Sequence, residues 1–268
     1  MRRVTILVVA LLVATLPALG QAPGAARGEE EALWRDFAAW VGQLTPAPES
    51  AGAFIRARYV EHLVATGVSR EEALRRFSVI DAYRRGSVER ERIYWDGLFK
   101  LRGGPNQPLR LLQEVVRGAK PGVALDVAMG SGRNSIFLAS IGWQVTGYDM
   151  SQPALDAAKA AAAKAGTAIT TVNATHDAFE FGEARWDLIV ISYAYVDPSD
   201  PAWPARLQRA LKPGGLIVMQ ETVRPGATAA SVVANWSAFR VLRFEQPEAS
   251  SEDWLPNQPY LRLVLRKQ

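Results

Sequence analysis

Apolar residues in the first half of the chain recur at helical spacing. Six of them lie three or four positions apart and form one apolar face: Leu33, Trp34, Phe37, Trp40, Val41 and Leu44. Similar spacing predicts helices over 53–65, 88–99 and 109–116. Ser69, followed three residues later by Glu72, has the form of a capping box and predicts a further helix from there to about Tyr83. Residues 29–117 therefore form a predicted helical segment.

From residue 118 onward, short apolar runs alternate with amphipathic stretches. Strands are predicted at 123–127, 144–149, 169–173, 186–193, 211–221, 241–244 and 260–265, and helices at 133–140, 153–165, 203–211 and 227–239. Strands that alternate with helices favour a parallel sheet covered by helices. Residues 260–265 alternate cleanly between apolar and polar positions, as an antiparallel terminal hairpin does. The pattern predicts an α/β core at 118–268.

Composition narrows the class of protein. With 268 residues and 49% hydrophobic content, the chain can bury a full α/β core. Its formal charge is +4, and without Arg2 and Arg3 it is 29 − 27 = +2, with no basic stripe, so we expect no nucleic-acid partner. Cysteine is absent and histidine occurs only at His62 and His176, which excludes thiolate zinc sites. We expect no bound metal.

The first 22 residues have the pattern of a secretory signal peptide. Two arginines precede a thirteen-residue apolar core at 4–16, and small residues follow at 18–22. A membrane-spanning helix needs about 20 apolar residues, so this core is short for a permanent anchor. We expect an exported protein, periplasmic or secreted, if the leader is cleaved, with a small-residue linker at 23–28. The alternatives are an anchor at 4–16 or a cytoplasmic protein.

A glycine-rich turn follows the first predicted strand directly. Gly130 and Gly132 lack a Cβ, so the backbone can turn sharply and approach a ligand. Asp149 ends the next strand, 17 residues after Gly132. That is about the separation at which a second-strand carboxylate binds the hydroxyls of a ribose. The turn alone could serve only tight packing of a helix on the sheet, but together with Asp149 it favours a nucleoside ligand.

Three segments of the chain resemble the class I, Rossmann-like methyltransferases that use S-adenosylmethionine. Asp126-x-x-x-Gly130-x-Gly132 is similar to their first motif. Residues 186–193 are similar to their fourth strand, and Leu-Lys-Pro-Gly-Gly at 211–215 is similar to the turn before their fifth. The resemblance implies a doubly wound sheet of seven strands, mostly parallel with the last antiparallel, under an N-terminal helical cap. It also implies methyl transfer to a small molecule by in-line displacement, through proximity and desolvation.

The resemblance further implies a set of cofactor-binding residues: Asp126, Ala128, Met129, Gly130, Ser131, Gly132, Asp149, Met150, Asp177 and Ser192. Asp126 would bind the ammonium of S-adenosylmethionine, Asp149 the ribose, Met150 the adenine ring and Asp177 the adenine amino group. Asp126 could instead cap the turn, and Asp177 could be a solvated loop residue. Ala128 replaces a glycine common in the family, and we expect it to keep a negative φ.

Tyr193 and His176 are the candidates for a direct part in catalysis. Tyr193 could line the acceptor pocket or belong to the core, and His176 could be a general base or a loop histidine. The fourth strand ends in Ser-Tyr-Ala-Tyr and lacks the Pro-Pro-Tyr signature of enzymes that methylate DNA adenine or glutamine. Aromatic residues and a Gly-Gly hinge at 94–106 favour a lid over the cofactor, whereas residues 29–85 could equally be a layer that only covers the sheet.

The sequence is also compatible with two other functions. The chain could be a non-catalytic module that binds S-adenosylmethionine or another nucleoside, because an exported protein has no obvious supply of the cofactor. It could also be a nicotinamide-dependent oxidoreductase. Ser135 argues against the second, since it occupies the position of the third glycine in the dinucleotide-binding motif.

Overall fold

The computed structural model describes residues 23–45, 54–102, 107–196, 198, 200–222, 229–247 and 260–268. The expected signal peptide at 1–22 and the expected hinge at 103–106 lie outside these residues. No helix in the described ranges combines the length and the apolar character that crossing a membrane requires.

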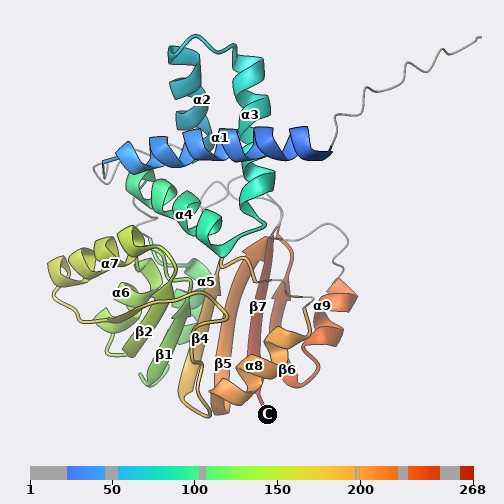
Figure 1. The fold of residues 1–268 in the computed structure, drawn as a ribbon. Coiled ribbons are helices and arrows are strands. Elements are labelled where there is room, and N and C mark those ends of the chain that lie inside the picture. Colours follow the sequence, from blue (N-terminus) through green and yellow to red (C-terminus); the bar gives the residue numbers. More distant parts are fainter. Residues whose placement is uncertain are drawn as a thin grey trace, which may run out of the picture.

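The core is a seven-stranded sheet in the order β3-β2-β1-β4-β5-β7-β6 (Figure 1). Its strands are β1 Val123–Val127, β2 Gln144–Asp149, β3 Thr170–Asn173, β4 Trp186–Ser192, β5 Leu211–Thr222, β6 Phe239–Glu245 and β7 Tyr260–Lys267. The first five run parallel, and β7 pairs antiparallel with both β5 and β6. The predicted fold is thus confirmed, including the antiparallel last strand.

Helices cover both faces of this sheet, because successive side chains of a strand point to opposite faces. Ala124 packs in a cluster with α5 (Arg110–Val116) and α6 (Arg133–Ser140). Its neighbour Leu125 packs in a second cluster with α8 (Ala202–Ala210) and α9 (Ala229–Asn235). Helix α7 (Gln152–Lys164) packs beside α6 against β2 and β3. The result is a three-layer core.

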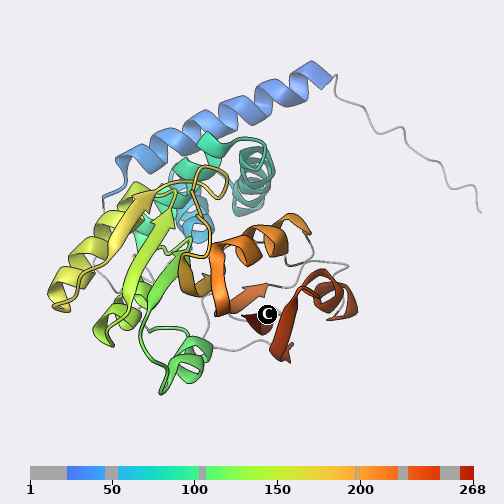
Figure 2. The same cartoon turned by 90° about the horizontal axis from the view of Figure 1, so that it is seen from below.

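Four further helices form a cap at one end of the sheet (Figures 1 and 2). They are α1 Pro23–Gln43, α2 Ile55–Ala65, α3 Arg70–Arg84 and α4 Val88–Arg102. The apolar face predicted for α1 is buried around Phe37, which packs edge-on against Tyr59 of α2 at 5.0 Å between ring centroids. Ser69 caps α3 as predicted, since its hydroxyl accepts from the Glu72 N–H at 3.2 Å. The cap therefore has an apolar core of its own.

Two expected boundaries differ from the structure. Residues 23–28, expected as a linker, are the first turns of α1, because small alanines are compatible with a helix as well as with a linker. The helical cap was expected to extend to residue 117, but α5 contacts β5 and packs on the sheet. Leu112 of α5 is fully buried there, so α5 belongs to the core layer and the cap ends with α4.

Candidate functional site

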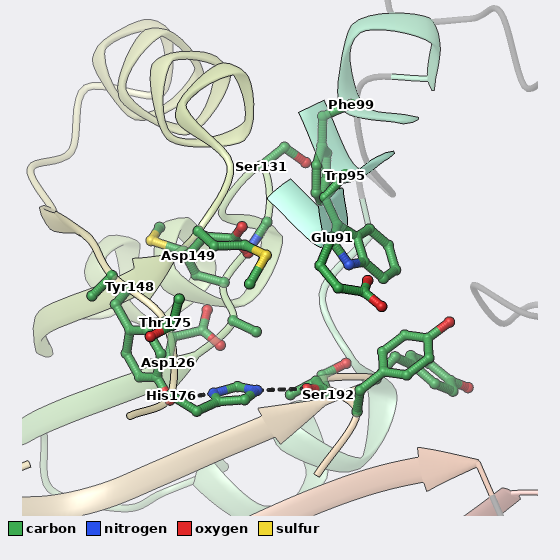
Figure 3. A pocket seen from close by; sticks show the side chains of 18 of the residues that line it. Glu91, Trp95, Phe99, Asp126, Ser131, Tyr148, Asp149, Thr175, His176 and Ser192 are labelled. Atoms are coloured by element: carbon green, nitrogen blue, oxygen red, sulfur yellow. Dashed lines mark hydrogen bonds between the residues drawn. The ribbon is translucent and has the colours of Figure 1, made fainter. Parts of the chain in front are cut away.

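A cavity of about 760 Å³ lies between the cap and the sheet edge formed by the carboxyl ends of the parallel strands (Figure 3). One end is formed by the ends of β2 and β3, with Asp149, Met150 and Thr175. The other end lies at β4 and β5, under Arg84, Glu91 and Trp95 of the cap. Small-molecule sites in α/β sheets lie at this edge, and the volume is within the range of such sites.

The glycine turn forms the floor of this cavity. Gly130 has φ +54°, and a Cβ built there would lie 3.0 Å from the Phe99 ring of α4. Gly132 has φ +84° and does not line the cavity. A Cβ on Gly132 would lie 3.0 Å from the Cβ of Ala158, so this glycine serves the packing of the turn against α7. The turn therefore combines a glycine that lines the cavity under Phe99 with a glycine that packs against α7.

Three residues at the cavity have left-handed backbone conformations that side chains with a Cβ rarely adopt. Ala128 has φ +49°, Tyr193 +53° and Tyr195 +59°. The expectation of a negative φ at Ala128 was wrong: the turn requires the glycine-like conformation, and alanine adopts it at a cost of about 1–2 kcal/mol. Strained residues persist where the surroundings fix them, and they cluster at functional sites.

Asp149 is buried beside the glycine turn, and both of its carboxylate oxygens accept backbone hydrogen bonds. Oδ2 accepts from the Gly130 N–H and Oδ1 from the Ser151 N–H, each at 2.9 Å. Burial raises the pKa of this carboxyl, while the two N–H donors oppose the rise. Each oxygen of a carboxylate can accept a further bond, so Asp149 can also bind hydroxyl groups that enter the cavity.

Asp126 lies at the end of β1 and lines the cavity with 1% of its surface exposed. Its Oδ2 accepts from the Ser135 hydroxyl at 2.7 Å. Burial raises the pKa of Asp126 to about 6, although the hydrogen bond from Ser135 and the charge of Arg133 act in the opposite direction. A buried carboxyl with a raised pKa at a cavity wall is suited to bind a cationic group.

His176 also lines the cavity, but both of its ring nitrogens are engaged. Nε2 lies 2.9 Å from the Ala194 carbonyl, which can only accept, so Nε2 carries the proton. Nδ1 then accepts from the Tyr148 hydroxyl at 2.8 Å. Burial lowers the pKa of His176, which keeps the ring neutral. The geometry gives His176 the role of joining β2 to the loop after β4, and it leaves no nitrogen to act as the expected general base.

Tyr193 is buried between the cap and the sheet. Its hydroxyl accepts from Gln220 Nε2 at 2.8 Å, and Gln220 Oε1 accepts from Arg262 Nε at 3.0 Å. The ring packs with the apolar core of the cap. Tyr193 therefore both lines the cavity and belongs to a core, and its place in an acceptor pocket stays a prediction.

The remaining predicted residues divide into two groups. Ala128, Met129, Ser131, Met150 and Ser192 line the cavity. Asp177 does not, because 94% of its side chain is exposed and it faces Arg206 at 3.6 Å. Ala174 and Thr175, from the loop before it, line the cavity, and the contact of Asp177 with an adenine amino group stays a prediction.

Sequence reasoning missed several charged residues of the cavity wall. Arg133 donates through Nη2 to the Ser192 hydroxyl at 2.7 Å and through Nη1 to the Gln107 carbonyl at 3.3 Å. Arg84 and Glu91 pair with each other at the cavity. Charged residues on an amphipathic helix normally face water, so only their position against the sheet edge identifies them.

Comparisons with known proteins relate the core of this chain to methyltransferases. Residues 124–215 match the model of a family described as a methyltransferase domain, and the match runs from β1 into β5 without the cap. The strand order and the cavity at the carboxyl edge are those of the class I methyltransferase fold. A structure from Galdieria sulphuraria, named as a proposed sarcosine dimethylglycine methyltransferase, aligns with TM-score 0.50 at 14% identity, covering 59% of this chain and 84% of that one.

Two curated methyltransferases are similar to this chain in amino-acid sequence. An uncharacterized methyltransferase of Synechocystis sp. is 34% identical over 108 residues, 38% of this chain and 47% of that protein. The ribosomal RNA small subunit methyltransferase C of Alcanivorax borkumensis is 28% identical over 139 residues, 48% of this chain and 42% of that protein. The chain thus spans about half the length of the curated relatives it matches.

No group of three or more potential metal ligands occurs in the part of the chain that the structure describes.

Proposed function

We propose that this protein transfers a methyl group from S-adenosylmethionine to a small molecule. The observation that carries the proposal is the position of the Asp149 carboxylate against Gly130, at a cavity, because both residues belong to the segment that matches a methyltransferase domain. S-adenosylmethionine supplies an electrophilic methyl group on a sulfonium. The residues of the cavity supply its binding, its orientation and the exclusion of water.

The cavity residues fit the parts of this cofactor. Asp149 would bind the ribose hydroxyls, and Met150, next to it, would cover the adenine. Asp126, whose pKa is raised to about 6 by burial, would pair with the methionyl ammonium through the carboxylate that lines the cavity. Gly130 and Ser131 offer backbone that a ligand can approach closely.

Transfer by in-line displacement requires little chemistry from the protein beyond positioning. Trp95 and Phe99 of α4 cover the cavity opposite the glycine turn, so the cap would exclude water from the reacting groups. Holding two reactants in line can supply several kcal/mol of the barrier reduction, about 7–11 at the upper end. We therefore assign α4 the role of a lid, and Asp149, Gly130 and Asp126 the role of fixing the donor.

Isothermal titration calorimetry with S-adenosylmethionine tests this proposal. The wild-type protein should bind, and Asp149→Ala should weaken binding at least about tenfold, since a hydrogen bond to a charged group is worth about 1.5–3 kcal/mol. Asp156→Ala is the control, because Asp156 is exposed on α7 and accepts only from Gln152. Circular dichroism checks that both variants fold. Absence of binding heat in the wild type would contradict the proposal, and binding without transfer to any acceptor would favour the non-catalytic module.

We further propose that the protein is exported and that the leader at 1–22 is removed. The support is the sequence pattern of Arg2, Arg3 and the apolar core at 4–16. Intact mass measurement of the protein purified from its native host would give the mature N-terminus. A mass that includes residues 1–22 would instead indicate an uncleaved leader.

A further inference from the structure

The end of the cavity at β4 and β5 is lined by residues to which we assign no part in binding S-adenosylmethionine. Thr222 and Tyr195 form it from the sheet side, and Arg84, Glu91 and Trp95 form it from the cap. Asp149 and Met150, which we assign to the donor, lie at the opposite end, two strands away in the sheet order. An acceptor in line with the donor would therefore lie between Trp95, Tyr195 and Glu91.

Glu91 is held in a fixed orientation at this end. Its Oε2 accepts a hydrogen bond from Arg84 Nη1, and Arg84 is buried, bonded through Nε to Asp81 at 2.8 Å and stacked over the Tyr94 ring at 3.9 Å. The other oxygen, Oε1, has no hydrogen-bond partner among the described residues. Figure 3 shows the Glu91 carboxylate directed into the cavity beside the indole of Trp95. Glu91 thus presents one oxygen that can accept a proton.

The other carboxylates of the cavity, Asp126 and Asp149, are assigned to S-adenosylmethionine at the donor end, and the remaining proton acceptors discussed above are engaged within the protein. Both nitrogens of His176 and both oxygens of Asp149 accept or donate within the protein. The Tyr193 hydroxyl accepts from Gln220. Among the described residues at the β4–β5 end, Glu91 is therefore the carboxylate placed to receive a hydrogen from an acceptor.

Aromatic rings form the walls around Glu91. The rings of Trp95 and Tyr195 meet edge to face with 5.3 Å between centroids. Tyr195 is 53% exposed and lines the cavity. Its backbone has φ +59°, a strained conformation of the kind that clusters at functional sites. The indole N–H of Trp95 has no hydrogen-bond partner in the described ranges and can donate to a ligand oxygen. These surfaces fit a flat ring that carries a hydroxyl group.

We propose that the acceptor is a hydroxylated aromatic molecule, and that Glu91 is the catalytic residue that takes its proton; this inference rests on the proposed methyl transfer. As the C–S bond of the sulfonium breaks, its electron pair stays on sulfur, and a new C–O bond forms from the phenolic oxygen. The phenolic proton moves to Glu91 Oε1 and then to solvent. A carboxylate can assist a phenol, with a pKa near 10 as in tyrosine, whereas an aliphatic alcohol is too weak an acid.

The probe is 7-hydroxycoumarin, with the full chain and S-adenosylmethionine, at pH values from about 6 to 10. We expect formation of the methyl ether, detected by mass spectrometry, and no transfer to cyclohexanol. Glu91→Gln keeps an oxygen for Arg84 but cannot take a proton, and it should lower kcat at neutral pH by about 100-fold with KM little changed. The deficit should narrow as pH rises, because the phenolate needs no base. Glu89→Gln is the matched control, since Glu89 lies on the same helix with its side chain 65% exposed.

A second readout does not depend on turnover. The absorbance of 7-hydroxycoumarin distinguishes phenol from phenolate, and the Glu91 carboxylate should disfavour the phenolate by its charge. The bound probe should therefore ionise at lower pH in Glu91→Gln than in the wild type or Glu89→Gln. The inference fails if the wild type binds S-adenosylmethionine but methylates no phenol, or if Glu91→Gln matches the wild type in both pH profiles. Failure of S-adenosylmethionine to bind would instead overturn the proposed function itself.

Discussion

At the scale of single residues, two buried carboxylates define the donor end of the cavity and differ in how they are satisfied. Asp149 accepts from backbone N–H groups, among them those of Gly130 and Ser151, whereas Asp126 accepts from the hydroxyl and the backbone N–H of Ser135 and lies near the charge of Arg133. Burying a carboxylate costs free energy unless donors or cations compensate it. Asp126 therefore lowers the stability of the free protein while it prepares the site for a cation.

The direction of the pKa shift of Asp126 determines how the free-energy cost of burying its carboxylate depends on pH. The pKa of Asp126 rises from 3.8 to about 6 on folding, so the folded state binds more protons between these values. The stability that protonation of Asp126 contributes to the folded state is fully present below pH 3.8 and is lost as pH rises through about 6. Above that pH the folded protein carries the whole cost of the buried charge.

Asp126→Asn should therefore stabilise the free protein at pH 7–8, by on the order of 2 kcal/mol, because the amide is neutral and its oxygen can still accept from Ser135. The same change should weaken binding of S-adenosylmethionine, since the ammonium loses its charged partner. Urea denaturation at pH 7.5 and at pH 4 measures the first effect, and the stabilisation should shrink at pH 4. A variant that is less stable at both pH values would show that the carboxylate is compensated in the free protein.

At the scale of elements, helix α4 connects the two parts of the molecule. It packs on α1 and α2 through one face and contacts α7 of the core through another. Gly97 allows the close approach to the cap, because a Cβ there would lie 2.9 Å from side-chain atoms of Val41 and Ile55. The position of α4, and with it Trp95 and Phe99, depends on that contact.

Two glycine-to-alanine changes in cap helices should have opposite signs. Gly97→Ala should destabilise the protein by about 1–3 kcal/mol through overpacking against Val41 and Ile55. Gly42→Ala in α1 meets no atom within 4 Å and should stabilise by up to about 1 kcal/mol through helix propensity. Thermal denaturation of both variants compares them directly. Equal effects would mean that α4 can shift away from α1 and α2 at little cost.

At the scale of the whole molecule, the cavity joins the cap to the core. Its walls come from α3 and α4 on one side and from the ends of β1, β2, β4 and β5 on the other. Phe99 lies on Gly130, so the lid and the glycine turn are in direct contact. A ligand that binds in this cavity therefore contacts both parts and stabilises them together.

S-adenosylmethionine at about 100 times its Kd should stabilise the protein by about 2.7 kcal/mol. For a chain of this size that corresponds to a rise in Tm of roughly 5–11 °C. Hydrogen exchange should slow in α4 as well as in the turn at 128–132, because both line the cavity. Slower exchange in the turn alone would show that the cap does not close on the ligand.

Prediction from the sequence succeeded where the signals are local. The bounds of β1, β2 and α6 were predicted as the structure has them, since an apolar run, a glycine turn and an apolar helix face follow one another within a few residues. The order of the motifs also fixed the seven-stranded sheet. The contrary cases are the backbone angle of Ala128, which the residue type did not reveal, and the hydrogen bonds of His176, which join it to Tyr148 and Ala194 in other parts of the chain.

The sequence by itself determined the α/β core, the glycine turn and the carboxylates Asp126 and Asp149, because the turn and the strand ends bring these groups to one edge whatever the rest of the chain does. Only the tertiary structure decided which charged residues of the cap face the cavity and which face water. Arg84 and Glu91 look like any other charges on amphipathic helices, and their place against β4 and β5 follows from how the cap packs on the sheet. Contacts between residues distant in the chain depend on packing, and no local pattern encodes them.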